Sequence, residues 1–106
     1  MPSSAHVFKA LADPTRREIL QLLKDGELAA GEIAAGFEMS GPSISRHLAI
    51  LSTAGLIRSR RDANRIIYAL EPKPLAEALN DFLSNVCPTQ IIKRKRSKAG
   101  KHRGQS

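Results

Sequence analysis

The eight residues from Ser40 to His47 concentrate the polar chemistry of this 106-residue chain. They contain three serines, one arginine and one histidine around a single large apolar residue, Ile44. A hydroxyl and an imidazole can form a nucleophile and its base, but no carboxylate that would orient the histidine lies nearby. No glycine-rich loop follows a strand to hold a phosphate. We therefore expect no enzyme activity, and hydrogen bonding to a partner is the better use of these groups.

At 100° per residue, residues 40–53 predict a helix with two unlike faces. Ile44, Leu48 and Leu51 fall in a narrow arc that must face the core. Small and polar residues around one guanidinium, that of Arg46, make the opposite face. Such a face suits the major groove of DNA, where arginine can bond the O6 and N7 edge of guanine. An ordinary amphipathic helix with a solvated face is the alternative.

A second basic segment follows Gly55, where four arginines lie within eight residues beside a single acid. In a hairpin, these arginines can reach a minor groove or the DNA backbone, and Arg65 is the expected groove residue. Charges that protect a solvated sheet edge from pairing are the alternative. The candidate DNA-binding residues of both segments are Ser40, Gly41, Pro42, Ser43, Ser45, Arg46, His47, Arg58, Arg60, Arg61, Asn64 and Arg65.

Capping residues predict the helices that position these side chains. A short helix fits residues 6–11, and Asp13-Pro14 opens a second helix that ends near Gly26. The apolar stripe of the second helix is Ile19, Leu20, Leu22 and Leu23. A third, short helix fits residues 29–36, and Ser40 can cap the fourth.

After Gly55 the hydrophobic period changes from 3.6 to 2, which predicts strands over residues 56–61 and 65–70. Asp62-Ala63-Asn64 joins them as a turn in which Asn64 can take a positive φ. A last helix begins at Pro74 and ends at Cys87-Pro88. The order α-α-α-α-β-β-α predicts a mainly α fold with a β-hairpin wing, which is a winged helix-turn-helix.

The first and last predicted helices carry more apolar side chains than one small core needs. A single recognition helix also makes too few base contacts for useful specificity. We therefore expect a homodimer through these helices, with two recognition helices roughly 34–36 Å apart in successive major grooves. The expected dimer-interface residues are Val7, Phe8, Leu11, Leu75, Leu79, Phe82, Leu83 and Val86.

Charge is distributed unevenly along the chain. The 17 Lys and Arg exceed the 10 Asp and Glu, but seven of the basic residues lie in 89–106, which has no acid. Residues 1–88 are therefore formally neutral and form the expected DNA-binding and dimerisation domain. The composition of residues 89–106 predicts a disordered basic tail. A protein that binds nucleic acid without sequence preference through this tail is the alternative function.

Three segments together resemble one known family. They are Ala10 to Leu20 (ALADPTRREIL), Ser40 to Leu48 (SGPSISRHL), and Leu51 with Gly55-Leu56-Ile57. They look like the ArsR-type bacterial winged-helix repressors, and in particular the SdpR-like autorepressor branch. The resemblance implies a homodimer, built from the first and last helices, that binds an inverted repeat in double-stranded DNA and blocks transcription. It also suggests relief by a protein anti-repressor.

The chain departs from the metal-sensing pattern of that family. Residues 27–33 match the segment in which many relatives carry Cys-x-Cys, and alanines stand where the thiolates would be. The last helix offers only Glu77 and Asp81 and no histidine. Thiolates and neutral imidazoles bind zinc-class ions tightly, whereas exposed carboxylates are usually solvated. We therefore expect no metal and no other cofactor.

Two single residues keep open alternatives. His47 lies near the core arc, so it is either a half-buried structural residue or a phosphate contact. Cys87 is the only cysteine, which excludes an intrachain disulfide, although a disulfide across a dimer axis stays possible. Without a signal peptide or a membrane-length apolar run, the protein is expected in the bacterial cytoplasm, on the nucleoid.

Overall fold

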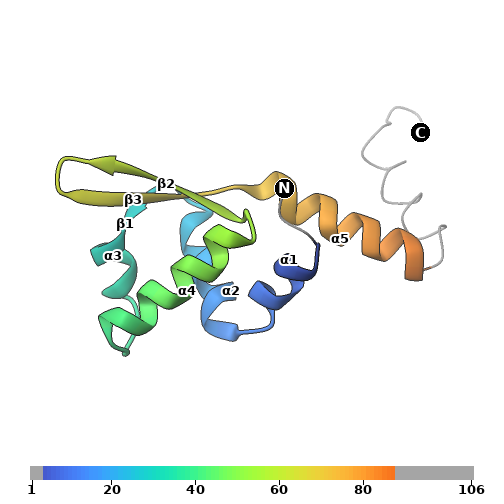
Figure 1. Ribbon diagram of the computed structural model, residues 1–106, viewed down its shortest axis with the longest axis horizontal. Helices are drawn as coiled ribbons and strands as arrows, with labels where there is room; N and C mark the ends of the chain where they lie inside the picture. The colour runs from blue at the N-terminus through green and yellow to red at the C-terminus, as the bar shows by residue number, and fades with distance from the viewer. Residues whose placement is uncertain (1–3, 88–106) are drawn as a thin grey trace. The chain divides into compact units, whose positions relative to one another are not determined.

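The computed structural model describes residues 4–87, and these divide into a unit up to Leu75 and a unit from Ala76. Residue 88 and the predicted tail at 89–106 lie outside the described residues. The first unit is mainly helical with one small sheet (Figure 1). Its elements are α1 (Ser4–Leu11), α2 (Pro14–Leu23), β1 (Leu28–Ala29), α3 (Ala30–Ala34), α4 (Gly41–Thr53), β2 (Ile57–Asp62) and β3 (Arg65–Leu70). The last helix, α5 (Pro72–Val86), begins in this unit and makes up most of the described part of the second.

Local capping chemistry sets the ends of α2 as predicted. The Asp13 carboxylate accepts hydrogen bonds from the backbone N–H groups of Thr15 at 2.7 Å and Arg16 at 3.3 Å. These bonds satisfy two of the N–H groups that a helix start leaves without partners. At the other end the N–H of Gly26 donates to the carbonyl of Leu23, and Gly26 takes a positive φ of 146°.

The predicted N-cap of α4, Ser40, is also present. The Ser40 hydroxyl accepts a hydrogen bond from the backbone N–H of Ser43 at 3.2 Å. After the helix, Gly55 has a φ of 77°, and its N–H donates to the carbonyl of Ser52. The N–H of Leu56 reaches back to the carbonyl of Leu51 at 3.1 Å. This pair of bonds is a Schellman motif, which turns the chain directly from α4 into the wing.

The sheet has three strands, one more than the predicted hairpin. Its order is β1-β3-β2, and both neighbouring pairs are antiparallel. β1 pairs Leu28 with Tyr68 and Ala29 with Ile67, so it joins the start of α3 to the wing. A strand of two residues shows no measurable alternation, so β1 could not be predicted from hydrophobic periodicity. β1 includes residue 29 of the predicted third helix. That helix, α3, spans residues 30–34 instead of the predicted 29–36.

The wing turn differs from the prediction in one residue. Asp62 pairs with Arg65, which leaves Ala63 and Asn64 as a two-residue loop. Among the described non-glycine residues, only Ala63 has a positive φ, at 59°. The prediction that Asn64 would take the positive φ is therefore wrong. A positive φ at the first central residue is the arrangement of a type II′ turn, whose twist suits a hairpin.

The core of the first unit confirms most of the predicted apolar arcs. Ile44, Leu48 and Leu51 of α4 are buried, as are Ile19, Leu20 and Leu23 of α2. Leu22 is 41% exposed, so its predicted place in the stripe of α2 is wrong.

The last helix starts two residues earlier than predicted, at Pro72 rather than Pro74. Proline is well suited to a first helical turn because its missing N–H would have no partner there. Of the residues that α5 contributes, only Ala78 is buried. None of the helices within residues 4–87 is long and apolar enough to cross a membrane.

Candidate nucleic-acid interface

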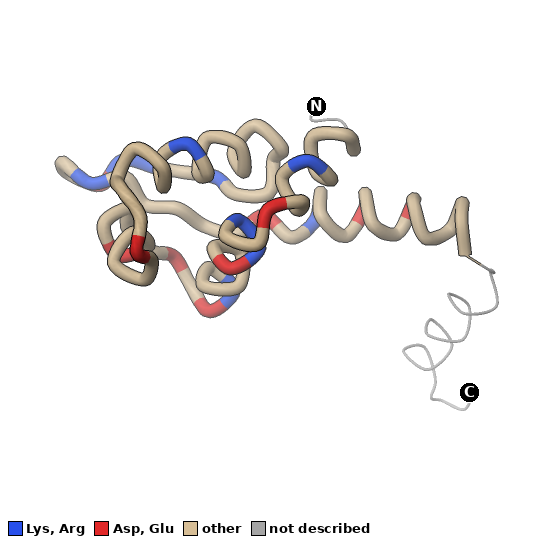
Figure 2. The backbone as a smooth tube through the Cα atoms, turned by 90° about the horizontal axis from the view of Figure 1, so that it is seen from below, with Lys and Arg blue, Asp and Glu red and all other residues tan. Residues whose placement is uncertain are grey.

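The outer face of α4 is small, polar and open to solvent, as the sequence predicts. Its exposed residues include Ser43, Ser45, Arg46 and Ala49. Within residues 4–87, Arg46 makes no hydrogen bond or ion pair, so its five N–H donors are available to a partner. Figure 2 shows Lys and Arg positions on α4, along the wing and on α1. The first two are the segments that the sequence singled out.

A buried arginine supports α4 from beneath. Arg16 of α2 is 9% exposed, and its Nε donates to the carbonyl of Ala10 at 2.7 Å. Its Nη2 donates to the carbonyl of Lys9 at 3.0 Å, and its Nη1 lies 3.2 Å from Nδ1 of His47 on α4. One guanidinium therefore fastens the end of α1 to both α2 and α4. Sequence reasoning missed this role, because the partners of Arg16 come from separate elements.

His47 is half-buried and faces Arg16, which agrees with the structural alternative considered for it. The other candidates from the start of the helix are exposed: Ser40, Gly41, Pro42, Ser43 and Ser45. The Ser40 hydroxyl also donates to the hydroxyl of Ser43 at 3.0 Å, so these two side chains are held together at the N-terminal end of α4. A contact of His47 with DNA stays a prediction.

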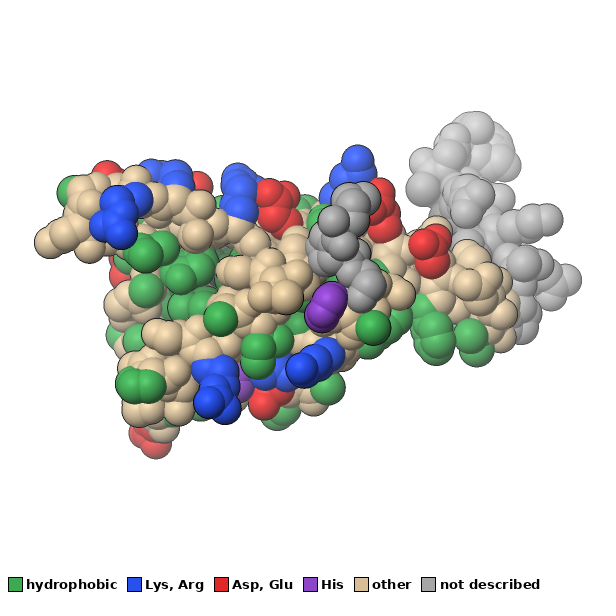
Figure 3. Space-filling model, viewed as in Figure 1, with side chains coloured by type: hydrophobic (Ala, Val, Ile, Leu, Met, Phe, Trp, Pro, Cys, Tyr) green, Lys and Arg blue, Asp and Glu red, His purple; other side chains and the backbone are tan. Residues whose placement is uncertain are grey.

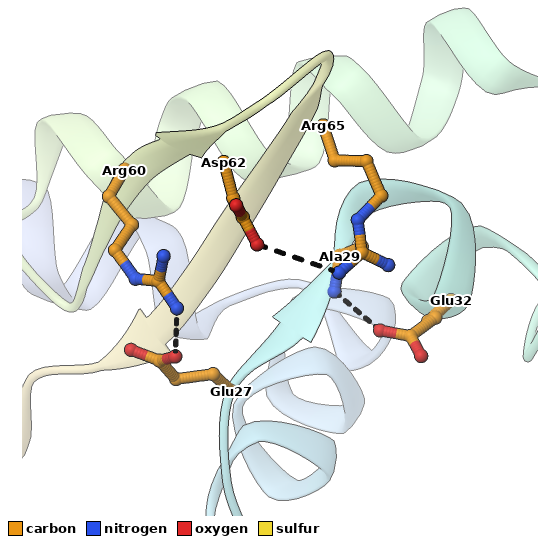
Figure 4. A network of polar contacts seen from close by, with 6 residues as sticks. All are labelled: Glu27, Ala29, Glu32, Arg60, Asp62 and Arg65. Atoms are coloured by element: carbon orange, nitrogen blue, oxygen red, sulfur yellow. Dashed lines mark hydrogen bonds and ion pairs between the residues drawn. The ribbon is translucent and has the colours of Figure 1, made fainter.

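Two of the four wing arginines are paired with carboxylates from outside the hairpin. Arg60 Nη2 lies 2.7 Å from Glu27 Oε1, just before β1, and Figure 4 shows the two side chains pointing toward each other. Arg58 Nη1 lies 2.9 Å from Glu71 Oε2, just after β3. Both pairs are exposed, so they add little to stability. Their effect is to neutralise, at the sheet itself, two of the four positive charges that the sequence places on the wing.

The other two arginines lie closer to the tip and are less well paired. Arg65 is 3.9 Å from Asp62 across the end of the hairpin (Figure 4). Arg61 is exposed and makes no ion pair with any carboxylate of residues 4–87. Asn64 is exposed at the turn. The tip therefore carries most of the unneutralised charge of the wing.

Two carboxylates of this unit have lowered pKa values. The hydrogen bond from the Arg60 guanidinium holds the pKa of Glu27 below its ordinary value, and the same contact raises the pKa of Arg60. Burial alone would raise the pKa of Asp13. The backbone hydrogen bonds from Thr15 and Arg16, together with the charges of His47 and Arg16, outweigh it and lower the pKa. Both carboxylates are therefore held in the ionised form.

A cleft of about 690 Å³ separates the wing from the first half of α4. Gly41 and Ser45 line it on the α4 side, and Asn64 and Arg65 line it on the wing side. Figure 3 shows apolar side chains in the hollow between these two elements. The candidate contacts of α4 and of the wing tip thus border one cleft, although they lie about 20 residues apart in sequence.

The part of α5 in the second unit presents a line of exposed apolar side chains. Leu79, Phe82, Leu83 and Val86 recur at helical spacing and are 36%, 51%, 44% and 63% exposed. In the first unit, Phe8, Leu11 and Leu75 are half-buried. Val7 is 2% exposed within the protomer, so it belongs to the protomer core and has little area left for a partner.

The positions considered for a metal site carry side chains that do not bind metal ions. Ala29 and Ala30 stand at the start of α3, where neither side chain can ligate an ion. Residues 4–87 contain no group of three or more His, Cys, Asp or Glu placed to bind one ion. Cys87 is half-buried, directly after α5.

A short helix, a turn, a second helix with a polar outer face and a β-hairpin beside it define a class of protein, the winged helix-turn-helix DNA-binding regulators. Residues 13–59 match the sequence profile described as "Bacterial regulatory protein, arsR family". The Transcriptional repressor SdpR of Bacillus subtilis is 48% identical over 79 residues, which span 74% of this chain and 88% of that protein. The HTH-type transcriptional regulator Rv2034 of Mycobacterium tuberculosis is 42% identical over 80 residues, 76% of this chain and 75% of that one.

The fold gives the same result. A crystal structure described as an ArsR family transcriptional regulator superposes with a TM-score of 0.73 at 31% identity, over 89% of this chain and 97% of that one. The chain belongs to the ArsR family of bacterial regulatory proteins. This confirms the resemblance and the winged helix-turn-helix fold predicted from the sequence, and the family consists of DNA-binding transcriptional regulators rather than enzymes.

Proposed function

We propose that this protein is a homodimeric transcriptional repressor that binds an inverted-repeat operator in double-stranded DNA and regulates its own gene. The observation that carries the proposal is the outer face of α4. It is exposed, small enough to enter a major groove, and centred on Arg46, whose guanidinium makes no ion pair within residues 4–87. Similarity to a relative named as a transcriptional repressor supports repression.

In this proposal α4 reads bases and the wing tip holds the backbone. Arg46 bonds a guanine edge, and the hydroxyls of Ser43 and Ser45 bond base edges or phosphates. Arg61, Asn64 and Arg65 contact the backbone or the minor groove beside it. The other predicted DNA-binding residues, at the start of α4 and on β2, make additional contacts in this proposal.

The experiment that tests this function is an in vitro selection from random duplex DNA with the full-length protein at physiological salt. Enrichment of an inverted repeat, with half-sites about one helical turn apart, is the expected result. Deleting residues 89–106 separates the two functions considered. A repressor that reads sequence through α4 keeps its preference, whereas a protein that binds through its basic tail loses nearly all affinity. Failure of the folded protein to enrich any sequence would overturn the proposal.

Dimerisation is proposed through the first and last helices. The exposed stripe Leu79, Phe82, Leu83 and Val86 supports it, because four large apolar side chains in a row on one helix mark an interaction surface. Leu83→Glu should produce monomers in analytical ultracentrifugation and lose operator binding. Ser84→Glu is the matched control, since it places the same charge on the neighbouring exposed residue. Equal behaviour of the two variants would contradict this interface.

We further propose that no metal ion and no small-molecule cofactor controls DNA binding, and that a protein anti-repressor relieves repression. The alanines at positions 29 and 30 support the first part. Zn²⁺, Co²⁺ or arsenite should therefore leave operator affinity unchanged. A tenfold loss of affinity with any of them would refute it. The site of action would be the bacterial cytoplasm, on the nucleoid, where the duplex partner lies.

A further inference from the structure

A notch of about 300 Å³ lies where α1 meets the exposed edge of α4. Two successive turns of α1 contribute His6 and Lys9, and α4 contributes a line of residues that begins at Arg46. The other lining residues are Ala49, Ile50 and Thr53. The described lining contains no carboxylate, and its two permanent cations are Lys9 and Arg46. Because Arg46 is assigned to a base edge, Lys9 is the cation left for a phosphate. A binding site of this composition suits a phosphate group.

The notch and the wing cleft lie on different edges of α4. The notch uses residues 46, 49, 50 and 53, whereas the wing cleft uses residues 41, 44, 45 and 48. On a helix with 100° per residue these two sets point to nearly opposite edges, with the exposed face between them. Figure 1 shows the same arrangement, since the wing and α1 lie on opposite sides of α4.

The width of the major groove explains why both edges of α4 can lie near DNA. The major groove is about 12 Å wide, and an α-helix with its side chains is about 10–12 Å across. A recognition helix in the groove is therefore flanked by both sugar-phosphate strands. The wing lies on one side of α4, so within this major groove it is placed beside one of the two strands (Figure 1).

We propose that Lys9 of α1 binds a backbone phosphate of the strand that the wing does not reach, so that each protomer holds both strands bordering its half-site. This inference rests on the proposed DNA-binding function and extends it to a helix outside the helix-turn-helix and the wing. Lys9 is exposed, and within residues 4–87 its side chain makes no ion pair.

The position of Lys9 relative to α4 is fixed by the arginine beneath it. The Arg16 guanidinium donates to the backbone carbonyls of Lys9 and Ala10, and its Nη1 lies within hydrogen-bond distance of Nδ1 of His47 on α4. α1 is thus held against α4 by hydrogen bonds as well as by apolar packing. On α1, Lys9 points away from Leu11, so the proposed dimer contact leaves the lysine open.

The test is the salt dependence of binding by full-length Lys9→Gln, measured by fluorescence anisotropy on a duplex that the wild-type protein has enriched from a random pool. Loss of one phosphate contact should make the plot of log Kd against log salt about 0.9 less steep per protomer. The ranking of single-base variants of that duplex should stay unchanged, because a phosphate carries no sequence information. Lys9→Arg should restore the wild-type slope.

Lys24→Gln is the matched control, since Lys24 is an exposed lysine at the end of α2, outside the notch. It should keep the wild-type slope. An unchanged slope in Lys9→Gln, or an equal change in both variants, would overturn the inference. A change in base ranking would overturn it too, because Lys9 would then read a base. The proposed function is tested separately, by whether the wild-type protein enriches a duplex at all.

Discussion

The outer face of α4 and the wing make opposite use of their arginines. α4 has one, Arg46, and no carboxylate of the described chain lies within ion-pair distance of it. The wing has four, yet Arg58, Arg60 and Arg65 have carboxylates at 2.9, 2.7 and 3.9 Å. The four positive charges of the wing are therefore largely neutralised by neighbouring carboxylates at its surface. A count of basic residues indicates where DNA could bind, but ion pairing determines how much charge remains to bind it.

The two elements also differ in how firmly they are held. α4 inserts Ile44, Leu48 and Leu51 into the core along its length. The wing buries Ile57, Ile67 and Ala69 but leaves the whole stretch 58–66, which includes its tip, exposed. A site that reads bases needs fixed geometry, and one that follows a backbone tolerates movement. This difference supports the proposal that α4 reads bases and that the wing contacts the backbone.

The largest effect is expected from Arg46→Ala. It should weaken binding to the enriched duplex by about 1–3 kcal/mol per half-site and relax the preference at one base pair. Arg58→Ala is the comparison, because Glu71 already neutralises that guanidinium and its loss should matter less. The measurement is the affinity of both protein variants for the enriched duplex and for its single-base variants. An equal loss on every duplex would make Arg46 a phosphate contact.

A smaller effect should separate the wing arginines from one another. Arg61→Ala should make the salt dependence of binding about 0.9 less steep per protomer. Arg65→Ala should act similarly, since its carboxylate partner is distant, whereas Arg60→Ala should change the slope less because Glu27 neutralises it. Salt titrations of the three variants measure this. Equal slopes for Arg60→Ala and Arg61→Ala would show that ion pairing does not control the wing.

An acid titration should test the N-cap of α2, the helix that carries the arginine beneath α4. The folded state lowers the pKa of Asp13 below its ordinary value near 3.8. Its contribution to stability is therefore complete above that value and is lost as the pH falls through the lower, folded pKa. Asp13→Asn should flatten the dependence of the urea midpoint on pH below about 4 relative to wild type. The same slope in both proteins would mean that the charge of Asp13 adds nothing.

The smallest effect is expected at the wing turn. Ala63 holds a φ of 59°, which costs a residue with a Cβ about 1–2 kcal/mol. Ala63→Gly removes that strain but stabilises the unfolded chain by about 0.4–1 kcal/mol through its extra freedom, so a net gain of about 0–1.6 kcal/mol is expected. Asn64→Gly, without strain to relieve, should lose stability. Urea denaturation of both variants measures the difference, and a loss in Ala63→Gly would contradict the strain.

What the sequence predicts well here is local. The caps at Asp13, Gly26 and Ser40 act within a few residues, so both ends of α2 and the start of α4 follow from neighbouring residues. Helical spacing likewise placed Ile44, Leu48 and Leu51 in the core.

What the sequence could not predict depends on residues that are distant in the chain. Arg16 meets His47 across 31 residues, and Arg60 meets Glu27 across 33. No periodicity encodes such pairs, and β1 becomes a strand only because β3 lies beside it. The notch at Lys9 could not be predicted from the sequence either, because its two walls come from α1 and α4.

Methylation protection can show whether α4 lies in the major groove with Arg46 against a guanine. Dimethyl sulfate methylates the N7 of guanine, which lies in the major groove, where Arg46 of α4 is proposed to bind. We expect one protected guanine in each half-site of the enriched duplex, about one helical turn apart. Arg46→Ala, bound at saturating concentration, should restore methylation at those guanines, whereas Arg58→Ala should leave them protected. Full methylation under saturating wild-type protein would contradict the claim that α4 reads the major groove.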